Sequence, residues 1–181
     1  MNIPNLISLA RLLSVPILVW AIVDGRMGLA FWLFAVAGLS DAVDGFIAKR
    51  FGSQSVVGGY LDPLADKALL MSVYITLGSE GYLPNWIVIL VVSRDVMIIG
   101  GVLLYHTLTH NLAMTPILIS KINTLAQILL AAFTLGSYAM EVEINIAYIA
   151  LVWLVAVTTI LSGASYLVRW VRKAATMEDA P

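Results

Sequence analysis

Cysteine is absent from the 181-residue chain, and charged residues are scarce. The first absence excludes disulfide bonds and thiolate metal sites, and it leaves the redox compartment undetermined. Charged residues make up 12% of the sequence, about half of what a soluble domain carries, whereas hydrophobic residues make up 61%. The net charge of −1, without any block of basic residues, gives no sign of a nucleic-acid partner. With a mean hydropathy of +0.95, the composition predicts a membrane protein.

Long apolar runs separated by short polar breaks follow one another along the chain. Runs of about 20 residues are long enough to cross a hydrocarbon core of ~30 Å as helices. The six runs are residues 1–23, 29–48, 56–77, 86–105, 121–140 and 144–168. No low-complexity tract or internal repeat interrupts them. The sequence therefore predicts an all-α integral membrane protein with six transmembrane helices in a single domain, residues 1–181.

Basic residues between the runs predict the orientation in the membrane. Only Arg26 falls in the loops of one side, and the basic residues of the other side are Lys49, Arg50, Lys121, Arg169, Arg172 and Lys173. The positive-inside rule then puts both termini and the loop at residues 49–55 on the cytoplasmic side. Residues 1–23 have no basic segment ahead of the apolar run, so we do not expect a signal peptide. The lack of a transit peptide favours a bacterial cytoplasmic membrane.

Four aspartates lie inside or beside the second and third apolar runs, where an unpaired charge is costly. Asp41 and Asp44 are three residues apart, and Asp62 and Asp66 are four apart. Each spacing places its pair on one face of a helix. Two helices facing each other through these pairs would gather all four carboxylates, which we call the quartet.

Like charges so close cannot all stay ionised without cations between them. Carboxylate oxygens are hard ligands, so Mg²⁺, Mn²⁺ or Ca²⁺ suits the quartet, with two ions for four charges. The alternatives are a buried charge pair, a proton relay, or the cation pathway of an ion-coupled transporter. Gly45, Ala48 and Gly58 beside the acids leave room for a ligand, and their alternative role is close helix packing.

This arrangement resembles the signature of the CDP-alcohol phosphatidyltransferases, DxxDGxxARx8GxxxDxxxD. The sequence Asp41-x2-Asp44-Gly45-x2-Ala48-Lys49-x8-Gly58-x3-Asp62-x3-Asp66 matches it everywhere except at Lys49, where the family usually has Arg. The resemblance implies two divalent cations, Mg²⁺ or Mn²⁺, and a homodimer. It implies that Asp66 accepts the proton of the attacking hydroxyl. The metal ligands that it implies are Asp41, Asp44, Asp62 and Asp66, and the nucleotide-binding residues are Gly45, Ala48, Lys49 and Gly58.

Other stretches narrow the resemblance within the family. Residues 2–11 and 62–67 are like both phosphatidylglycerophosphate synthases and CMP-forming cardiolipin synthases, whereas residues 93–98 and 119–124 look more like the cardiolipin synthases. This implies phosphatidyl transfer from CDP-diacylglycerol to phosphatidylglycerol, giving cardiolipin and CMP. The second expectation is glycerol 3-phosphate as the acceptor. The alternatives from other classes of protein are a cation-coupled transporter and a catalytically inactive membrane scaffold.

Three further cations sit in or at the ends of apolar runs. Arg94, inside the fourth run, requires an anion there, which can be Asp95, an acid of the quartet or a substrate phosphate. Lys121 begins the fifth run and can either extend to the membrane surface or bind phosphate. We predict that Arg94 and Lys121 bind the acceptor. Arg11 interrupts the first run and can reach either the headgroup level or the quartet.

Overall fold

The computed structural model is all-helical over residues 3–51, 56–109, 118–142 and 146–178, which are the residues it describes. Side chains are described for residues 6–40, 65–101, 118–142 and 146–171. The predicted all-α architecture is confirmed. The helices are α1 (Ile3–Val23), α2 (Met27–Phe51), α3 (Val56–Ser79), α4 (Asn85–Thr109), α5 (Leu118–Ala139) and α6 (Ile146–Glu178).

Glycines with positive φ end two of the helices at breaks that the sequence predicts. Gly25 (φ 72°) follows α1 and Gly81 (φ 78°) follows α3. After α1, the amide of Arg26 donates to the carbonyl of Ala21 at 2.8 Å, which satisfies one of the last carbonyls of the helix. Glycine is favoured at such a position because the left-handed conformation is costly for residues with a Cβ. These turns allow each helix to reverse direction within a few residues.

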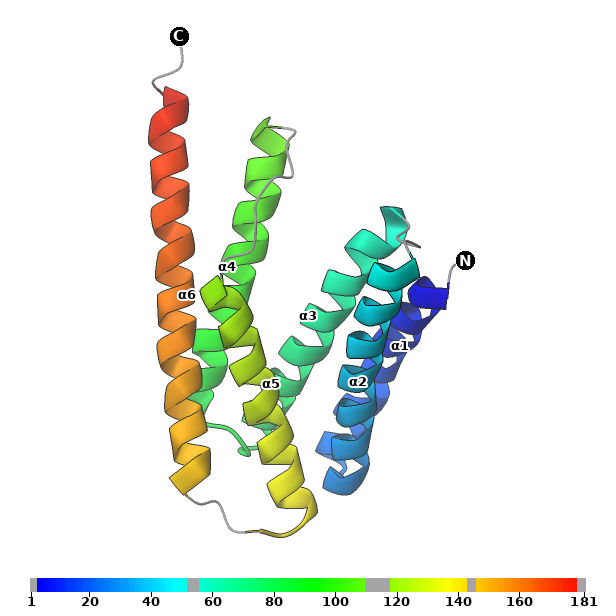
Figure 1. Ribbon diagram of the computed structural model, residues 1–181. Helices are drawn as coiled ribbons and strands as arrows, with labels where there is room; N and C mark the ends of the chain where they lie inside the picture. The colour runs from blue at the N-terminus through cyan, green and yellow to red at the C-terminus, as the bar shows by residue number, and fades with distance from the viewer. Residues whose placement is uncertain (1–2, 52–55, 110–117, 143–145, 179–181) are drawn as a thin grey trace. The chain divides into compact units, whose positions relative to one another are not determined.

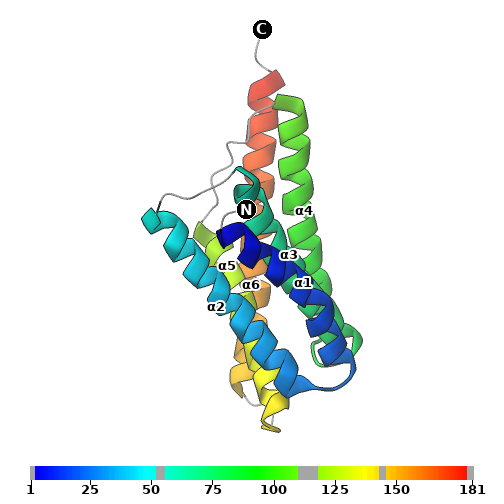
Figure 2. The ribbon, with the colours of Figure 1, turned by 90° about the vertical axis from the view of Figure 1, so that its right-hand side faces the viewer.

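One compact unit comprises Met1–Pro84 and Ala131–Asn145. In this unit α1 packs against both α2 and α3 (Figures 1 and 2). Leu18 and Ile22 of α1, Phe34 of α2, and Val73 and Leu77 of α3 are buried in its core. Helix α1 is therefore the common neighbour of the two helices that carry the quartet.

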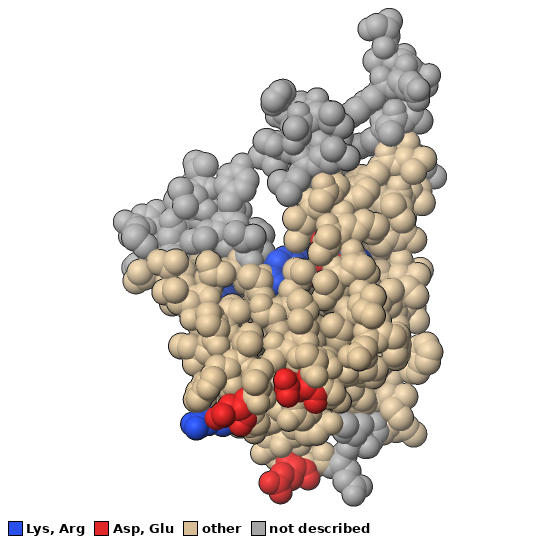
Figure 3. Space-filling view, turned by 180° about the vertical axis from the view of Figure 1, so that it is seen from behind, with Lys and Arg blue, Asp and Glu red and all other residues tan. Residues whose placement is uncertain are grey.

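The turns at one end of this unit are polar. The N-terminal halves of α1 and α3 and the C-terminal half of α2 lie at the other end (Figure 1). The turns expose Asp24, Arg26, Glu80 and Glu141. Figure 3 shows red and blue side chains gathered at the lower edge of the view, below a surface that is mostly tan. The turns are thus polar, and the quartet positions belong to the opposite end of the unit.

The second compact unit comprises Asn85–Leu130 and Ile146–Pro181, and in it α4 packs against α6. Ile87 and Val91 of α4 and Val155 of α6 are buried in its core. Helix α6 continues ten residues past Val168, where the sequence predicts that the apolar run ends. The added segment is rich in Arg, Lys, Ala, Met and Glu, which are good helix formers, so the helix continues although the apolar run does not.

Among the described residues, three helices are long and apolar enough to cross a membrane: Leu6–Val23, Leu118–Ala139 and Ile146–Val171. Within the part of α2 whose side chains are described, Met27–Ser40 is a shorter apolar stretch. The chain is thus a helical integral membrane protein. Six complete spans remain a prediction, because only parts of α2, α3 and α4 have described side chains.

Adjacent glycines in α4 give a test of this packing. A Cβ on Gly101 would lie 1.7 Å from the Trp170 ring of α6, whereas a Cβ on Gly100 would meet nothing within 4 Å. We expect Gly101→Ala to lower the free energy of unfolding by about 1–3 kcal/mol, the usual cost of overpacking. Gly100→Ala should be neutral or stabilising by up to about 1 kcal/mol, because alanine favours helix. Equal melting temperatures for the two variants in detergent would contradict the α4–α6 contact.

Candidate active site

The quartet lies on two helices of the first unit. Asp41 and Asp44 belong to α2, and Asp62 and Asp66 belong to α3, so each pair shares one helix face as the sequence predicts. The side chains of residues 41–64 lie outside the described residues. The roles predicted for seven residues there therefore remain predictions: Asp41, Asp44, Gly45, Ala48, Lys49, Gly58 and Asp62.

The donor set on α2 and α3 fits divalent cations. All four candidate ligands are carboxylates, the hard oxygen donors that Mg²⁺ and Mn²⁺ take in proteins. The side chain of Asp66 is 42% exposed, so an ion or a substrate can reach it. Helical register and ligand chemistry thus both suit a carboxylate-bound metal site.

Arg11 of α1 forms an ion pair with Asp66 of α3, in which Nη1 of the guanidinium donates to Oδ1 of the carboxylate. The arginine side chain is almost completely buried, at 2% exposure. Of the positions that the sequence allows for Arg11, the structure selects the one that reaches the quartet. The spacing of residues in the sequence could not identify Asp66 as this partner, because the two residues are 55 positions apart on helices that meet through tertiary packing.

Arg94 of α4 is buried in the second unit and makes three hydrogen bonds there. Nη1 donates to Oδ1 of Asp95 at 2.5 Å, and Nη2 donates to the hydroxyls of Ser120 and Ser162. Asp95 is completely buried. The pairing with Asp95 is one of the alternatives that the sequence leaves open for Arg94. The two stretches that look more like cardiolipin synthases than like phosphatidylglycerophosphate synthases, residues 93–98 and 119–124, are thus in direct contact through Arg94 and Ser120.

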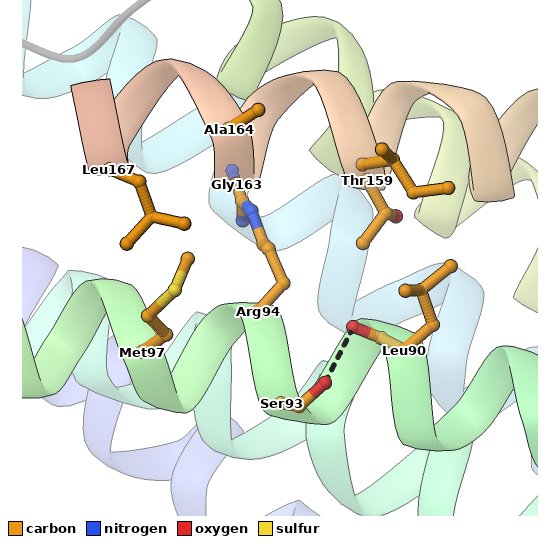
Figure 4. A pocket seen from close by; sticks show the side chains of 9 residues that line it. Leu90, Ser93, Arg94, Met97, Thr159, Gly163, Ala164 and Leu167 are labelled. Carbon is orange, nitrogen blue, oxygen red and sulfur yellow. Dashed lines mark hydrogen bonds between the residues drawn. The ribbon is translucent and has the colours of Figure 1, made fainter. Parts of the chain in front are cut away.

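A pocket of about 340 Å³ opens beside Arg94 between α4 and α6. Its walls are mostly apolar, with Met97 and Leu167 on one side of Arg94 in Figure 4 and Leu90 on the other. Gly163 also lines the pocket, and a Cβ there would make ordinary van der Waals contact with Cε of Met97 at 3.4 Å and Cγ of Arg94 at 3.7 Å. The pocket therefore combines apolar walls with the alkyl stem of a cation.

Helix α6 contributes polar residues that sequence reasoning missed. Asn123 of α5 accepts hydrogen bonds through Oδ1 from the hydroxyls of Thr158 and Thr159, each at 2.9 Å. Ser162, one turn further on, is the partner of Arg94. The available signal was a series of small polar residues in an apolar helix, a pattern typical of helix contacts in membranes. Lys121 is exposed in the first turn of α5, one residue after the partner of Arg94.

Three helices of membrane-spanning character, and two buried arginines that are each paired with an aspartate, define a helical integral membrane protein. The chain belongs to the CDP-alcohol phosphatidyltransferase family, because the model of that family matches residues 1–163. The matched range contains the complete signature.

Three relatives resemble the chain over nearly its whole length. It is 36% identical over 188 residues to the CDP-diacylglycerol–glycerol-3-phosphate 3-phosphatidyltransferase 1, chloroplastic, of Oryza sativa subsp. japonica, covering 94% of this chain and 57% of that protein. It is 36% identical over 182 residues to the cardiolipin synthase (CMP-forming) of Homo sapiens, covering 91% of this chain and 60% of the relative. A probable phosphatidylglycerophosphate synthase of Mycobacterium tuberculosis is 26% identical over 179 residues, covering 94% of this chain and 82% of that protein. The chain thus spans less than two thirds of the length of the first two relatives.

Proposed function

We propose that this chain transfers the phosphatidyl group of CDP-diacylglycerol to phosphatidylglycerol, giving cardiolipin and CMP. The observation that carries the proposal is the family match over residues 1–163, which includes the whole signature on α2 and α3. The likeness to the human cardiolipin synthase supports the choice of product.

In this proposal the quartet binds cations and Asp66 also acts as the general base. Asp41, Asp44, Asp62 and Asp66 would hold two divalent cations, Mg²⁺ or Mn²⁺. When bound, the cations neutralise the diphosphate of the CDP-lipid and favour the departure of CMP. Asp66 takes the proton from the acceptor hydroxyl, whose oxygen bonds to the phosphatidyl phosphorus as the bond to CMP breaks.

The small residues of the signature supply the nucleotide site in this proposal. Gly45, Ala48 and Gly58 form the floor on which the cytidine nucleotide lies. Lys49 neutralises the diphosphate as a point charge, whereas the arginine usual in the family offers a planar fork. A cation-coupled transporter has no need of such a floor, so the same residues favour the enzyme.

The membrane arrangement is a second part of the proposal. Six spans, with both termini and the quartet on the cytoplasmic side, agree with the distribution of basic residues. A bacterial cytoplasmic membrane agrees with the bacterial relatives, among them a cardiolipin synthase (CMP-forming) of Streptomyces coelicolor, 33% identical over 114 residues. The homodimer stays a prediction from the family resemblance.

Glycerol 3-phosphate is the second candidate acceptor, and the name of the rice relative favours it. It is small and nearly dianionic, so it suits a closed pocket with several cations. Two of the candidate cations here are already engaged in ion pairs, Arg11 with Asp66 and Arg94 with Asp95. An apolar pocket beside Arg94 suits a lipid acceptor with a single charge. These observations favour phosphatidylglycerol.

The acceptor is tested by giving the purified protein CDP-diacylglycerol with phosphatidylglycerol or with glycerol 3-phosphate, each alone. Mass spectrometry of the lipid product should find cardiolipin in the first sample. Phosphatidylglycerophosphate in the second sample, with no cardiolipin in the first, would contradict the assigned acceptor and leave the phosphatidyltransferase class standing.

Substitution of Arg94 tests whether that residue binds the acceptor. Arg94→Lys keeps a charge beside the buried Asp95 but loses the planar fork that bonds both serines. We expect the KM for phosphatidylglycerol to rise about tenfold, which corresponds to the loss of one charge-assisted hydrogen bond. The KM for CDP-diacylglycerol should stay unchanged. Arg169→Lys, at an exposed position of α6, is the matched control. Equal rises in both KM values would assign Arg94 a structural role.

A further inference from the structure

The two side chains of the ion pair between Arg11 and Asp66 differ widely in solvent exposure. The arginine side chain is 2% exposed, and the carboxylate side chain is 42% exposed. Arg11 lies in α1, within the apolar stretch Leu6–Val23 that is long enough to span a membrane. The guanidinium is therefore enclosed by the helices, while the carboxylate it holds is open to an approaching molecule.

A purely structural role does not account for a charged pair at this place. Charged residues within membrane-spanning segments are costly. Buried ion pairs often stabilise a fold no better than well-packed apolar residues of similar volume. Helix α1 packs against α3, and its apolar residues Leu18 and Ile22 are buried in the core of the unit, so burial of apolar surface already holds α1 in place.

The chemistry of the pair suits the control of a carboxylate's orientation. A guanidinium is planar, keeps its charge under all ordinary conditions and presents donors in a rigid geometry. Because Arg11 is anchored within the packed helices, its bond from Nη1 to Oδ1 restrains rotation of the Asp66 carboxylate. A general base is effective only when it lies within hydrogen-bond reach of the proton that it accepts.

We propose that Arg11 is a positioning residue for Asp66 and holds the carboxylate in the orientation in which it accepts the proton of the acceptor hydroxyl. The inference rests on the proposed function, because it requires Asp66 to be the base. During the reaction the proton moves from the hydroxyl to Asp66, and Arg11 keeps its own protons and its charge. Arg11 thus acts on the rate of the chemical step rather than on binding of the CDP-lipid.

The first test separates kcat from KM in single variants. Arg11→Ala should lower kcat about 10–100-fold, the loss typical of residues that orient a ligand or base. The KM for CDP-diacylglycerol should stay within about twofold, and Arg11→Lys should recover part of the loss. Arg26→Ala is the matched control, because Arg26 also pairs with an aspartate, Asp24 at 2.7 Å, but on the exposed surface. A wild-type kcat in purified Arg11→Ala protein would overturn the inference.

The second test asks whether Arg11 acts through Asp66. In an Asp66→Asn background, Arg11→Ala should reduce the residual rate less than about twofold, because the group that it positions is already lost. A full 10–100-fold loss in that background would mean that Arg11 acts independently, and it would overturn the inference. If Arg11→Ala fails to fold, the same comparison is made with Arg11→Lys. Its kcat should lie between the wild-type value and a value about 10–100-fold lower.

A third measurement does not depend on turnover. In chelator and detergent, Arg11→Ala and Asp66→Asn should each lower the melting temperature, and the double variant should melt no lower than the worse single variant. Additive shifts would show that the two residues are not coupled and would overturn the inference. Wild-type protein that releases no CMP would overturn the proposed function and this inference together, whereas active wild type with fully active Arg11→Ala would overturn only the inference.

Discussion

Asp66→Asn is expected to lower kcat by about 10²–10⁴-fold, the usual contribution of general-base catalysis. An amide cannot accept the proton of the attacking hydroxyl at neutral pH. The amide oxygen can still accept the hydrogen bond from Arg11, so we expect the fold and most of the nucleotide binding to survive. The measurement is the steady-state release of CMP by purified, folded protein.

Asp24→Asn is the matched control for this substitution. Asp24 also pairs with an arginine of the same unit, Arg26, but it lies in the exposed turn between α1 and α2. Its loss should leave kcat unchanged. Turnover by Asp66→Asn close to that of the wild type would exclude Asp66 as the base.

Asp62→Ala should weaken metal binding and nucleotide binding together. If the cations link the carboxylates to the diphosphate, loss of one ligand removes part of both sites. We expect Mn²⁺ affinity and turnover each to fall by at least about 10–100-fold, the loss seen even for residues outside the coordination shell. Electron paramagnetic resonance of free Mn²⁺ measures the affinity for the metal, and equilibrium binding of CMP measures the affinity for the nucleotide.

Asp41→Ala should have the same combined effect, since it removes a ligand from the other helix. Glu80→Ala, at an exposed turn after α3, is the control and should change neither affinity. The bridging role fails if Asp62→Ala binds CMP as tightly as the wild type and with the same dependence on Mn²⁺.

The helices could be predicted from the sequence because each apolar run is long and its break is chemically distinct. Gly25 and Gly81 end α1 and α3 at the predicted places because both adopt positive φ. The end of α6 was not predicted, because the segment after Val168 is polar but still helix-forming. Apolarity marks where a helix can enter a membrane, and it does not mark where the helix stops.

The candidate site could be predicted only where its residues are close in sequence. Asp62 and Asp66 are one helical turn apart, so their common face follows from helix geometry alone. The bond from Arg94 to Ser162 joins residues 68 positions apart, and it depends on the packing of α4 against α6. For Arg11 the sequence left two positions open, the headgroup level and the quartet, and tertiary packing places its guanidinium against Asp66.

The most direct test of the account measures CMP and cardiolipin together in one reaction. Purified protein in detergent receives CDP-diacylglycerol and phosphatidylglycerol, with Mg²⁺ or with chelator. Phosphatidyl transfer by this chain predicts one CMP for each cardiolipin formed, loss of both products on chelation, and recovery of both with Mg²⁺ or Mn²⁺. No release of CMP in the presence of either metal, with phosphatidylglycerol or glycerol 3-phosphate as the acceptor, would contradict it.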